Sequence, residues 1–189
     1  MQKYLSLQME KLRKELKKYL KDKFIIDIFI IGSSIKDKPE ARDIDLIVLF
    51  RESDYKKIEE SIYGIKRSIG IEGLHIEPLI VDDMLKESIF SSIIHEGISI
   101  RHDKNVSEMI GYKPFVQFTF ALENLDKVNK VKFAQALYGR KGQGILREEG
   151  GRQIGKGAFI VPVSKEHLFR EIMANFKVKY AVMRILANY

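Results

Sequence analysis

Two apolar runs near the N-terminus constrain the fold more than any other feature of the sequence. Ile25–Ile31 (IIDIFII) and Asp43–Phe50 (DIDLIVLF) are rich in β-branched residues and have the length of buried strands. Ser33–Arg42, between them, contains lysine, aspartate, proline and serine, which predicts a loop. The chain has 189 residues, of which 45% are apolar, so it is long enough to bury these strands in a core.

The rest of the N-terminal part is predicted from the spacing of its apolar residues. The expected elements are a helix over Gln2–Lys21, a helix over Ser53–Ile69, a strand over Leu74–Val81 and a helix that Asp82 or Asp83 caps and that runs to His95. The order strand–loop–strand–helix–strand–helix predicts an α/β or α+β protein with packed layers.

The C-terminal part, after Gly111, has a different composition. Gly139–Gly157 contains seven of the 13 glycines. The expected elements are strands over Pro114–Leu122, Ala158–Val163 and Lys177–Ile185 and helices over Glu123–Tyr138 and Glu166–Asn175. We therefore expect a domain over residues 1–108 and a smaller, basic, glycine-rich α+β region over residues 109–189.

The excess of positive charge lies in the C-terminal part. Residues 1–110 carry 19 Lys and Arg against 20 Asp and Glu, whereas residues 111–189 carry 14 against 6. Two interpretations of this excess are open: contact with a polyanion, or a basic surface without a partner.

Composition excludes several classes of protein. The chain has no cysteine, which excludes disulfides, zinc–thiolate sites and thiol catalysis. No apolar run reaches the ~18 residues of a membrane-spanning helix, and residues 1–23 are too charged to hold the apolar centre of a signal peptide. We therefore expect a cytoplasmic protein that does not bind membranes.

The residues with the clearest chemistry follow the first strand. Asp43 and Asp45 are two positions apart on a strand, so both carboxylates project from the same face. Such a pair is costly to bury unless a cation lies between the two groups, and Mg²⁺, which prefers oxygen ligands, meets this need. Gly32 and Ser33 offer backbone N–H groups and a hydroxyl to a phosphate at the end of the preceding strand. Together these features outline a site for phosphoryl or nucleotidyl transfer.

A third carboxylate would complete a two-metal site, and Glu77 is the best candidate. His75 and Glu77 share one face of the third expected strand. If that face adjoins the face of Asp43 and Asp45, Glu77 can bind the second metal or take the proton of the acceptor. The alternative is a purely structural one: Asp-x-Asp pairs also occur at strand edges, and Pro78 makes Glu77 equally suited to the solvent side of an edge strand.

This arrangement resembles the nucleotidyltransferase superfamily that includes DNA polymerase β and the minimal nucleotidyltransferases. The signature of that family is an apolar strand ending in Gly-Ser, an Asp-x-Asp opening the next strand and a third acidic residue on a later strand. Four residues match it directly, namely Gly32, Ser33, Asp43 and Asp45. Glu77 matches the third carboxylate, with His75 as the alternative at that position. The resemblance covers about residues 20–105.

The resemblance implies a nucleotidyltransferase fold, with a short mixed sheet flanked by helices. It implies Mg²⁺-dependent attack on the α-phosphate of an NTP with release of pyrophosphate. The residues expected to hold the triphosphate are Gly32, Ser33 and Ser34, with Lys36, Lys38 or Arg42 neutralising its charge. The acceptor stays open, because members modify RNA ends, DNA, small antibiotics or proteins. Some members act as antitoxin partners, so the rival interpretation is a non-catalytic module of the same fold that binds RNA or a partner protein.

The glycine-rich segment is the best candidate for contact with RNA or another nucleic acid. Glycines allow close approach of phosphates, and cations neutralise them. Its candidate cations are Arg140, Lys141, Arg147, Arg152 and Lys156. The competing interpretation is a set of tight turns between short elements. Nearby aromatic residues are expected in the core rather than stacked on bases, and these are Phe115, Phe118, Phe120 and Tyr138.

Overall fold

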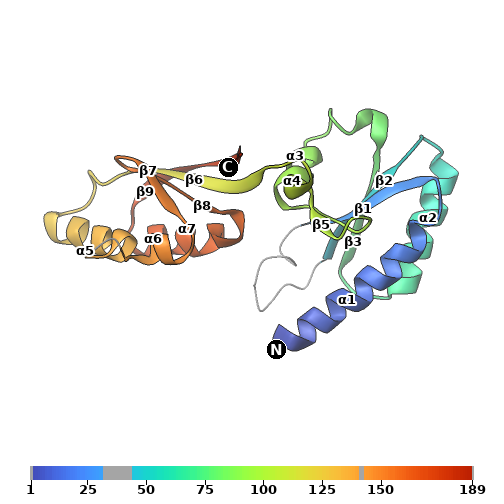
Figure 1. The fold of residues 1–189 in the computed structure, drawn as a ribbon, viewed down its shortest axis with the longest axis horizontal. Coiled ribbons are helices and arrows are strands. Elements are labelled where there is room, and N and C mark those ends of the chain that lie inside the picture. The colour runs from blue at the N-terminus through green and yellow to red at the C-terminus, as the bar shows by residue number, and fades with distance from the viewer. Residues whose placement is uncertain (1, 32–43, 141–142, 189) are drawn as a thin grey trace. The chain divides into compact units, whose positions relative to one another are not determined.

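The computed structural model describes residues 2–31, 44–140 and 143–188, with side chains from Met9 onward. In these residues the chain is a mixed α+β protein with seven α-helices and two β-sheets. It divides into two compact units, which we call unit 1 (Met1–Ile110) and unit 2 (Gly111–Tyr189). Each unit has its own sheet and its own helices (Figure 1). No helix in the described ranges has the length and apolar character needed to cross a membrane.

Unit 1 is built on a five-stranded mixed sheet in the order β3-β2-β1-β4-β5. Its elements are α1 (Gln2–Tyr19), β1 (Ile25–Ile31), β2 (Ile44–Phe50), α2 (Tyr55–Ile69), β3 (Leu74–Ile80), the 3₁₀ turn η1 (Val81–Asp83), α3 (Ile89–Glu96), β4 (Ile98–Ser99), β5 (Lys104–Asn105) and α4 (Val106–Met109). β1 and β2 are antiparallel, whereas β2 and β3 are parallel and are joined through α2. A parallel pair requires such a crossover, because the chain must return to the same end of the sheet.

The two faces of this sheet are covered by different helices. Ile28 and Val48 lie in one apolar cluster with residues of α1 and α2. Their neighbours along the strands, Phe29 and Ile47, face the other side and pack with Ile93 of α3. This alternation follows from the two-residue period of a strand. We call the second side the α3 face, and it is the side on which the candidate site lies.

One predicted helix of unit 1 is wrong at its start. The helix expected from Asp82 or Asp83 begins only at Ile89, because Val81–Asp83 forms a 3₁₀ turn. The Asp83 carboxylate accepts a hydrogen bond of 2.8 Å from Nζ of Lys86 and caps no helix. Val81 and Met84 pack against the core on the second side of the sheet, whereas Leu85 is 76% exposed.

Unit 2 is built on a four-stranded antiparallel sheet in the order β7-β8-β6-β9. Its elements are β6 (Lys113–Ala121), α5 (Lys127–Tyr138), α6 (Ile145–Glu148), β7 (Arg152–Gly155), β8 (Ala158–Pro162), the 3₁₀ turn η2 (Val163–Lys165), α7 (Glu166–Asn175) and β9 (Lys179–Ala187). The order β-α-β-β-α-β, counting α5 and α7 as the two long helices, is the split β-α-β arrangement. All three helices lie on one side of this sheet (Figure 1).

The first long helix of unit 2 begins later than predicted. Its expected start was Glu123, but α5 begins at Lys127 because Asp126 caps it. The Asp126 carboxylate accepts a hydrogen bond of 2.8 Å from the backbone N–H of Asn129. An aspartate that accepts from the third residue after it satisfies one of the free N–H groups of a first helical turn.

A buried glutamate ties the last helix of unit 2 to its last strand. Oε1 of Glu166 accepts a hydrogen bond of 2.8 Å from Nε of Arg170, and Oε2 accepts one of 3.4 Å from Arg184 of β9. The Glu166 side chain is only 9% exposed. The hydrogen bond that Arg170 donates to Glu166 is the main cause that raises the pKa of Arg170, so the guanidinium stays charged. Sequence patterning had placed Glu166 only as the first residue of a helix.

Candidate functional site

Asp45 occupies the point at which β1 ends and β2 begins. It is the second residue of β2, and its backbone lies opposite Ile31, the last residue of β1. Its alternation with Ile47 and Leu49 places it on the α3 face. The side chain of Asp45 is 40% exposed, so its carboxylate is accessible to ligands from solution.

His75 and Glu77 approach Asp45 from the neighbouring strand. The parallel register of β2 and β3 sets Asp45 beside His75 and Ile47 beside Glu77. Nδ1 of His75 lies 4.0 Å from Oδ1 of Asp45. Glu77 lies on the same face, at a Cα separation from Asp45 of about 8 Å, given the spacing of strands and residues in a sheet. His75 is therefore the direct neighbour of Asp45, and Glu77 is the next polar residue along that face.

β3 is an edge strand of the sheet in unit 1. His75, Glu77 and Pro78 are all exposed. Pro78 has no backbone N–H, which discourages another strand from pairing with this edge. Glu77 thus lies exposed on an edge strand, which leaves its carboxylate open to solution and fits both the structural interpretation and a ligand role.

The other residues predicted for this site fall outside the described residues. They are Gly32, Ser33, Ser34, Lys36, Lys38, Arg42 and Asp43. Among the residues that are described, no three His, Asp or Glu side chains are grouped closely enough to hold a metal ion. The described part of the site thus consists of Asp45 with His75 beside it and Glu77 one step farther along β3.

The cations predicted to contact nucleic acid lie on several elements of unit 2. Arg147 is on α6, Arg152 is on the edge strand β7, and Lys156 is in the turn that joins β7 to β8. Arg140 directly follows the Gly139 cap of α5, and Lys141 lies outside the described residues. Arg140, Arg147, Arg152 and Lys156 are all exposed. They come from the helix layer and from one sheet edge, so they do not form a single row along one element.

Two glycines of the glycine-rich segment serve tight packing of the backbone. A Cβ atom at Gly144 would lie 2.3 Å from the backbone nitrogen of Gly139. A Cβ atom at Gly139, where φ is +72°, would lie 2.6 Å from the backbone of Gln143 and Gly144. Both distances are too short for a side chain. At these positions the requirement for glycine comes from the turn itself, which supports the tight-turn interpretation of this part of the segment.

The four aromatic residues predicted to pack in the core of unit 2 are buried (Phe115, Phe118) or half-buried against it (Phe120, Tyr138). Phe118 is fully buried and stacks on Phe159 with ring centroids 5.0 Å apart. Phe120 meets Phe133 of α5 edge to face at 5.3 Å. Phe115 is 8% exposed. The buried rings of Phe115 and Phe118 are therefore not available to stack on bases.

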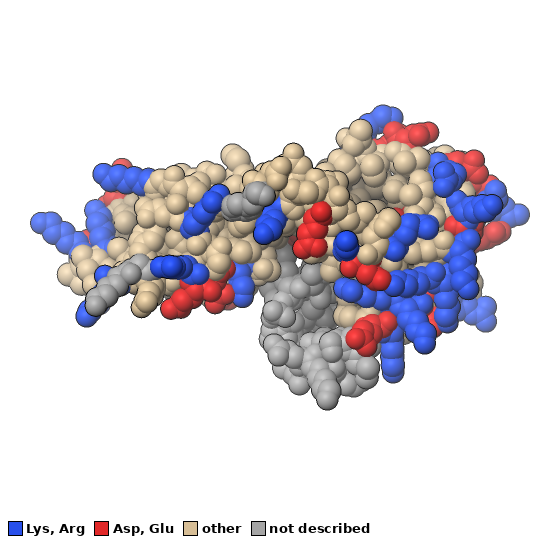
Figure 2. Space-filling view, viewed as in Figure 1, with Lys and Arg blue, Asp and Glu red and all other residues tan. Residues whose placement is uncertain are grey.

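Positive charge is also concentrated at the N-terminal end of unit 1. The comparison of residues 1–110 with residues 111–189 did not show this, because it summed the charge over the whole of unit 1. Residues 1–23 carry eight Lys and Arg against three Asp and Glu, whereas residues 24–110 carry 11 against 17. The near-neutral sum over unit 1 therefore hides two oppositely charged segments. Figure 2 shows Lys and Arg side chains gathered over the part of unit 1 that contains α1. A sum over each expected element, rather than over each half, would have found this segment.

Comparison with known proteins gives no relative. No family model matches the chain, and neither the curated proteins nor the solved structures include a significant match.

Proposed function

We propose that this protein is a Mg²⁺-dependent nucleotidyltransferase that transfers a nucleoside monophosphate from an NTP to an acceptor and releases pyrophosphate. The observation that supports it best is the position of Asp45 at the start of β2, opposite the last residue of β1, with His75 and Glu77 on the same face of the next strand. A carboxylate at this place is what the resemblance requires of the second aspartate in an Asp-x-Asp pair. The mixed sheet of unit 1 is compatible with the short mixed sheet of that family.

The proposed metal ligands are Asp43, Asp45 and Glu77. Asp45 and Glu77 supply exposed carboxylate oxygens, which are the donors that Mg²⁺ prefers. His75 supplies a ring nitrogen, which suits zinc or copper better than Mg²⁺. We therefore assign the third ligand position to Glu77 and give His75 the role of a neighbour that orients Asp45. Held by these carboxylates, Mg²⁺ would supply positive charge to neutralise the phosphates of the substrate.

The proposed nucleotide-binding residues come from the segment between β1 and β2. Gly32, Ser33 and Ser34 would hold the triphosphate, and Lys36, Lys38 or Arg42 would neutralise its charge. The proposed acceptor is RNA, because unit 2 carries 14 Lys and Arg against 6 Asp and Glu. Four of its exposed cations are the candidate contacts Arg140, Arg147, Arg152 and Lys156.

A transfer assay tests this proposal directly. The full chain is incubated with Mg²⁺ and each α-³²P-labelled NTP in the presence of total RNA and protein extract, and the products are digested with RNase or protease. We expect a labelled product whose sensitivity to digestion identifies the acceptor. Asp45→Asn is expected to lower the rate by about 100-fold or more, since losing an electrostatic interaction of ~3 kcal/mol in the transition state has that effect. Glu59→Gln, an exposed site on α2, is the control that also removes one negative charge.

A binding measurement separates the enzyme from the non-catalytic alternative. Mg²⁺ with a non-hydrolysable NTP at 100 times its Kd should raise the Tm of the wild-type chain by about 5–10 °C. Asp45→Asn should lose this shift and Glu59→Gln should keep it. If folded wild-type protein shows neither label nor shift with any NTP, the proposal is wrong and the non-catalytic alternative is the one to test next.

A further inference from the structure

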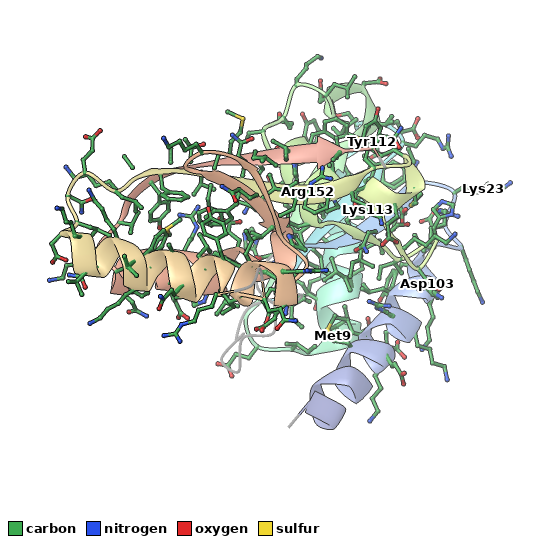
Figure 3. All side chains as sticks on the ribbon, turned by 60° about the vertical axis from the view of Figure 1, so that its left-hand side comes forward. Met9, Lys23, Asp103, Tyr112, Lys113 and Arg152 are labelled. Atoms are coloured by element: carbon green, nitrogen blue, oxygen red, sulfur yellow. The ribbon has the colours of Figure 1, made fainter. Side chains whose placement is uncertain are left out.

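Basic side chains converge around the C-terminal end of α1. They come from three segments that are far apart in the sequence: the end of α1 and the turn after it, the residue after β2, and the region of β5. We call them the α1 basic patch, which consists of Lys17, Lys18, Lys21, Lys23, Arg51, Arg101 and Lys104. All seven are exposed. In Figure 3, Lys23 points outward from the turn after α1, and Asp103 of the β5 region lies beside the helix.

Three side chains, Arg51, Arg101 and Lys17, hold the segments of this patch together. Nε of Arg51 donates a hydrogen bond of 3.1 Å to the backbone oxygen of Lys23. The guanidinium of Arg101 donates to the backbone oxygens of Leu20, at 3.5 Å, and Ile25, at 3.1 Å. Lys17 forms an ion pair with Asp103, the residue before Lys104. The fold therefore brings seven cations onto one surface, although residues 1–110 are nearly neutral in sum.

The fold itself requires only part of this charge. Lys17 and Lys18 lie in the last turn of α1, where positive charge complements the helix dipole, and Lys18 pairs with Glu15 at 2.6 Å. Lys21 and Lys23 lie beyond the helix and have no ion pair in the part of the chain that the structure describes. Lys11 and Lys14 extend the same exposed charge along α1. Lysines gathered in this way repel one another, which favours a ligand of opposite charge.

The position of the patch limits the size of that ligand. The patch lies at the start of β1, next to Ile25, whereas Asp45 lies opposite Ile31 at the other end of the strand. Six residue steps along a strand span about 20 Å. An NTP bound at Asp45 could not reach the patch, but a polymer with regularly spaced phosphates could. The apolar side of α1 is occupied, since Leu12 and Leu16 are buried in the core of unit 1, so the helix is not free to insert into a lipid surface.

From this arrangement we infer that the α1 basic patch binds the phosphate backbone of a nucleic acid. The inference concerns unit 1 and adds a second polyanion-binding surface to the cations of unit 2. It does not depend on the proposed transfer chemistry, because binding through the patch needs neither Asp45 nor a metal ion.

The test compares two charge-matched double variants of the full chain. Lys21→Gln with Lys23→Gln removes two positive charges from the patch, just after α1. Lys66→Gln with Arg67→Gln removes two positive charges from the exposed last turn of α2 and serves as the control. Fluorescence anisotropy with labelled single-stranded RNA and DNA 20-mers gives Kd at several salt concentrations. Asp45→Asn is measured in parallel to keep this test separate from catalysis.

We expect the patch variant to bind more weakly than the control and to show a shallower salt dependence. The slope of log Kd against log salt should fall by about 1.4, or ~0.7 for each phosphate of a single strand that the protein no longer neutralises. Asp45→Asn should bind as the wild type does. The inference is overturned if the wild type binds neither polymer, if the two double variants have equal Kd values and slopes, or if the patch affects binding only to anionic lipid vesicles.

Discussion

Ser99 donates a hydrogen bond of 2.5 Å from its hydroxyl to Oδ2 of Asp27, and both residues are buried in unit 1. Oδ1 of Asp27 accepts two further bonds, from the backbone N–H groups of Ile28 at 2.7 Å and Arg101 at 3.0 Å. Asp27 lies at an irregularity in the pairing of β1 with β2. Its carboxylate thus joins β1 to β4 and to the segment that carries Arg101 of the α1 basic patch.

This network predicts that unit 1 is stabilised by the hydrogen bonds that the side-chain oxygens of Asp27 accept, more than by the negative charge of Asp27. Asp27→Ala leaves buried donors without partners and should lower the free energy of unfolding by about 3 kcal/mol. Asp27→Asn keeps one oxygen for the two N–H groups and turns an amide toward Ser99, so its cost should stay below about 1 kcal/mol. Urea denaturation followed by circular dichroism measures both values. Equal losses in the two variants would contradict the network.

The assignment of the third metal ligand predicts different results for two neighbours on β3. Glu77→Gln should reduce nucleotidyl transfer by about 100-fold or more, as loss of a metal ligand does. His75→Gln should reduce it by only about 10-fold, because the proposed role of His75, whose Nδ1 lies 4.0 Å from Asp45, is to orient that carboxylate. Rates of transfer at several Mg²⁺ concentrations provide the measurement, and excess Mg²⁺ should partly rescue Glu77→Gln. The opposite order of effects would move the ligand position to His75.

The stacked pair in the core of unit 2 predicts a structural role for Phe118. Phe118→Ala should lower the stability of unit 2 by about 3–5 kcal/mol, because it leaves a cavity against Phe159 and Phe169. Phe118→Leu should fold and should leave the proposed affinity for RNA at the wild-type value. A marked loss of RNA affinity in folded Phe118→Leu would show that the ring stacks on bases after all.

The cap of α5 predicts a dependence of stability on acid. The backbone hydrogen bond from Asn129 is the main cause that lowers the pKa of Asp126. Because the pKa of the Asp126 carboxyl is lower in the folded than in the unfolded chain, the charged cap stabilises the fold at any pH above the unfolded pKa. This stabilisation is lost as the pH falls through the folded pKa. Between about pH 7 and pH 2, the wild type should therefore lose more stability than Asp126→Asn, whose neutral cap does not titrate. Urea midpoints at several pH values test this, and parallel curves for the two proteins would refute it.

The close approach of Gly139 and Gly144 predicts that their role is conformational. Gly144→Ala should lower the stability of unit 2 by about 2 kcal/mol or more, because the added methyl would overlap backbone atoms. Gly155→Ala is the control, since its Cβ would meet only Ala158 at the ordinary distance of 3.9 Å. Thermal unfolding distinguishes the two variants, and equal Tm values would show that the turn can relax around a side chain.

Local patterns of the sequence determined most helices and strands. The runs Ile25–Ile31 and Leu74–Ile80 are strands, and the helix Glu166–Asn175 has the predicted bounds, because periods of 2 and 3.6 residues act within a single segment. The starts of α3 and α5 were wrong for a related reason. Apolar spacing cannot show which of several polar residues makes the capping bond, and at α5 this is Asp126.

Only the tertiary structure decided which polar residues meet. The contact of His75 with Asp45 depends on the register of two strands separated by a whole helix. The α1 basic patch depends on Arg51 and Arg101, which are 28 and 81 positions from the residues that they bind near the end of α1. Composition and the spacing of apolar residues predict whether a segment is a helix, a strand or a loop. Strand register and long-range hydrogen bonds arise only when the whole chain packs, so the neighbours of a charged side chain are fixed only in the folded protein.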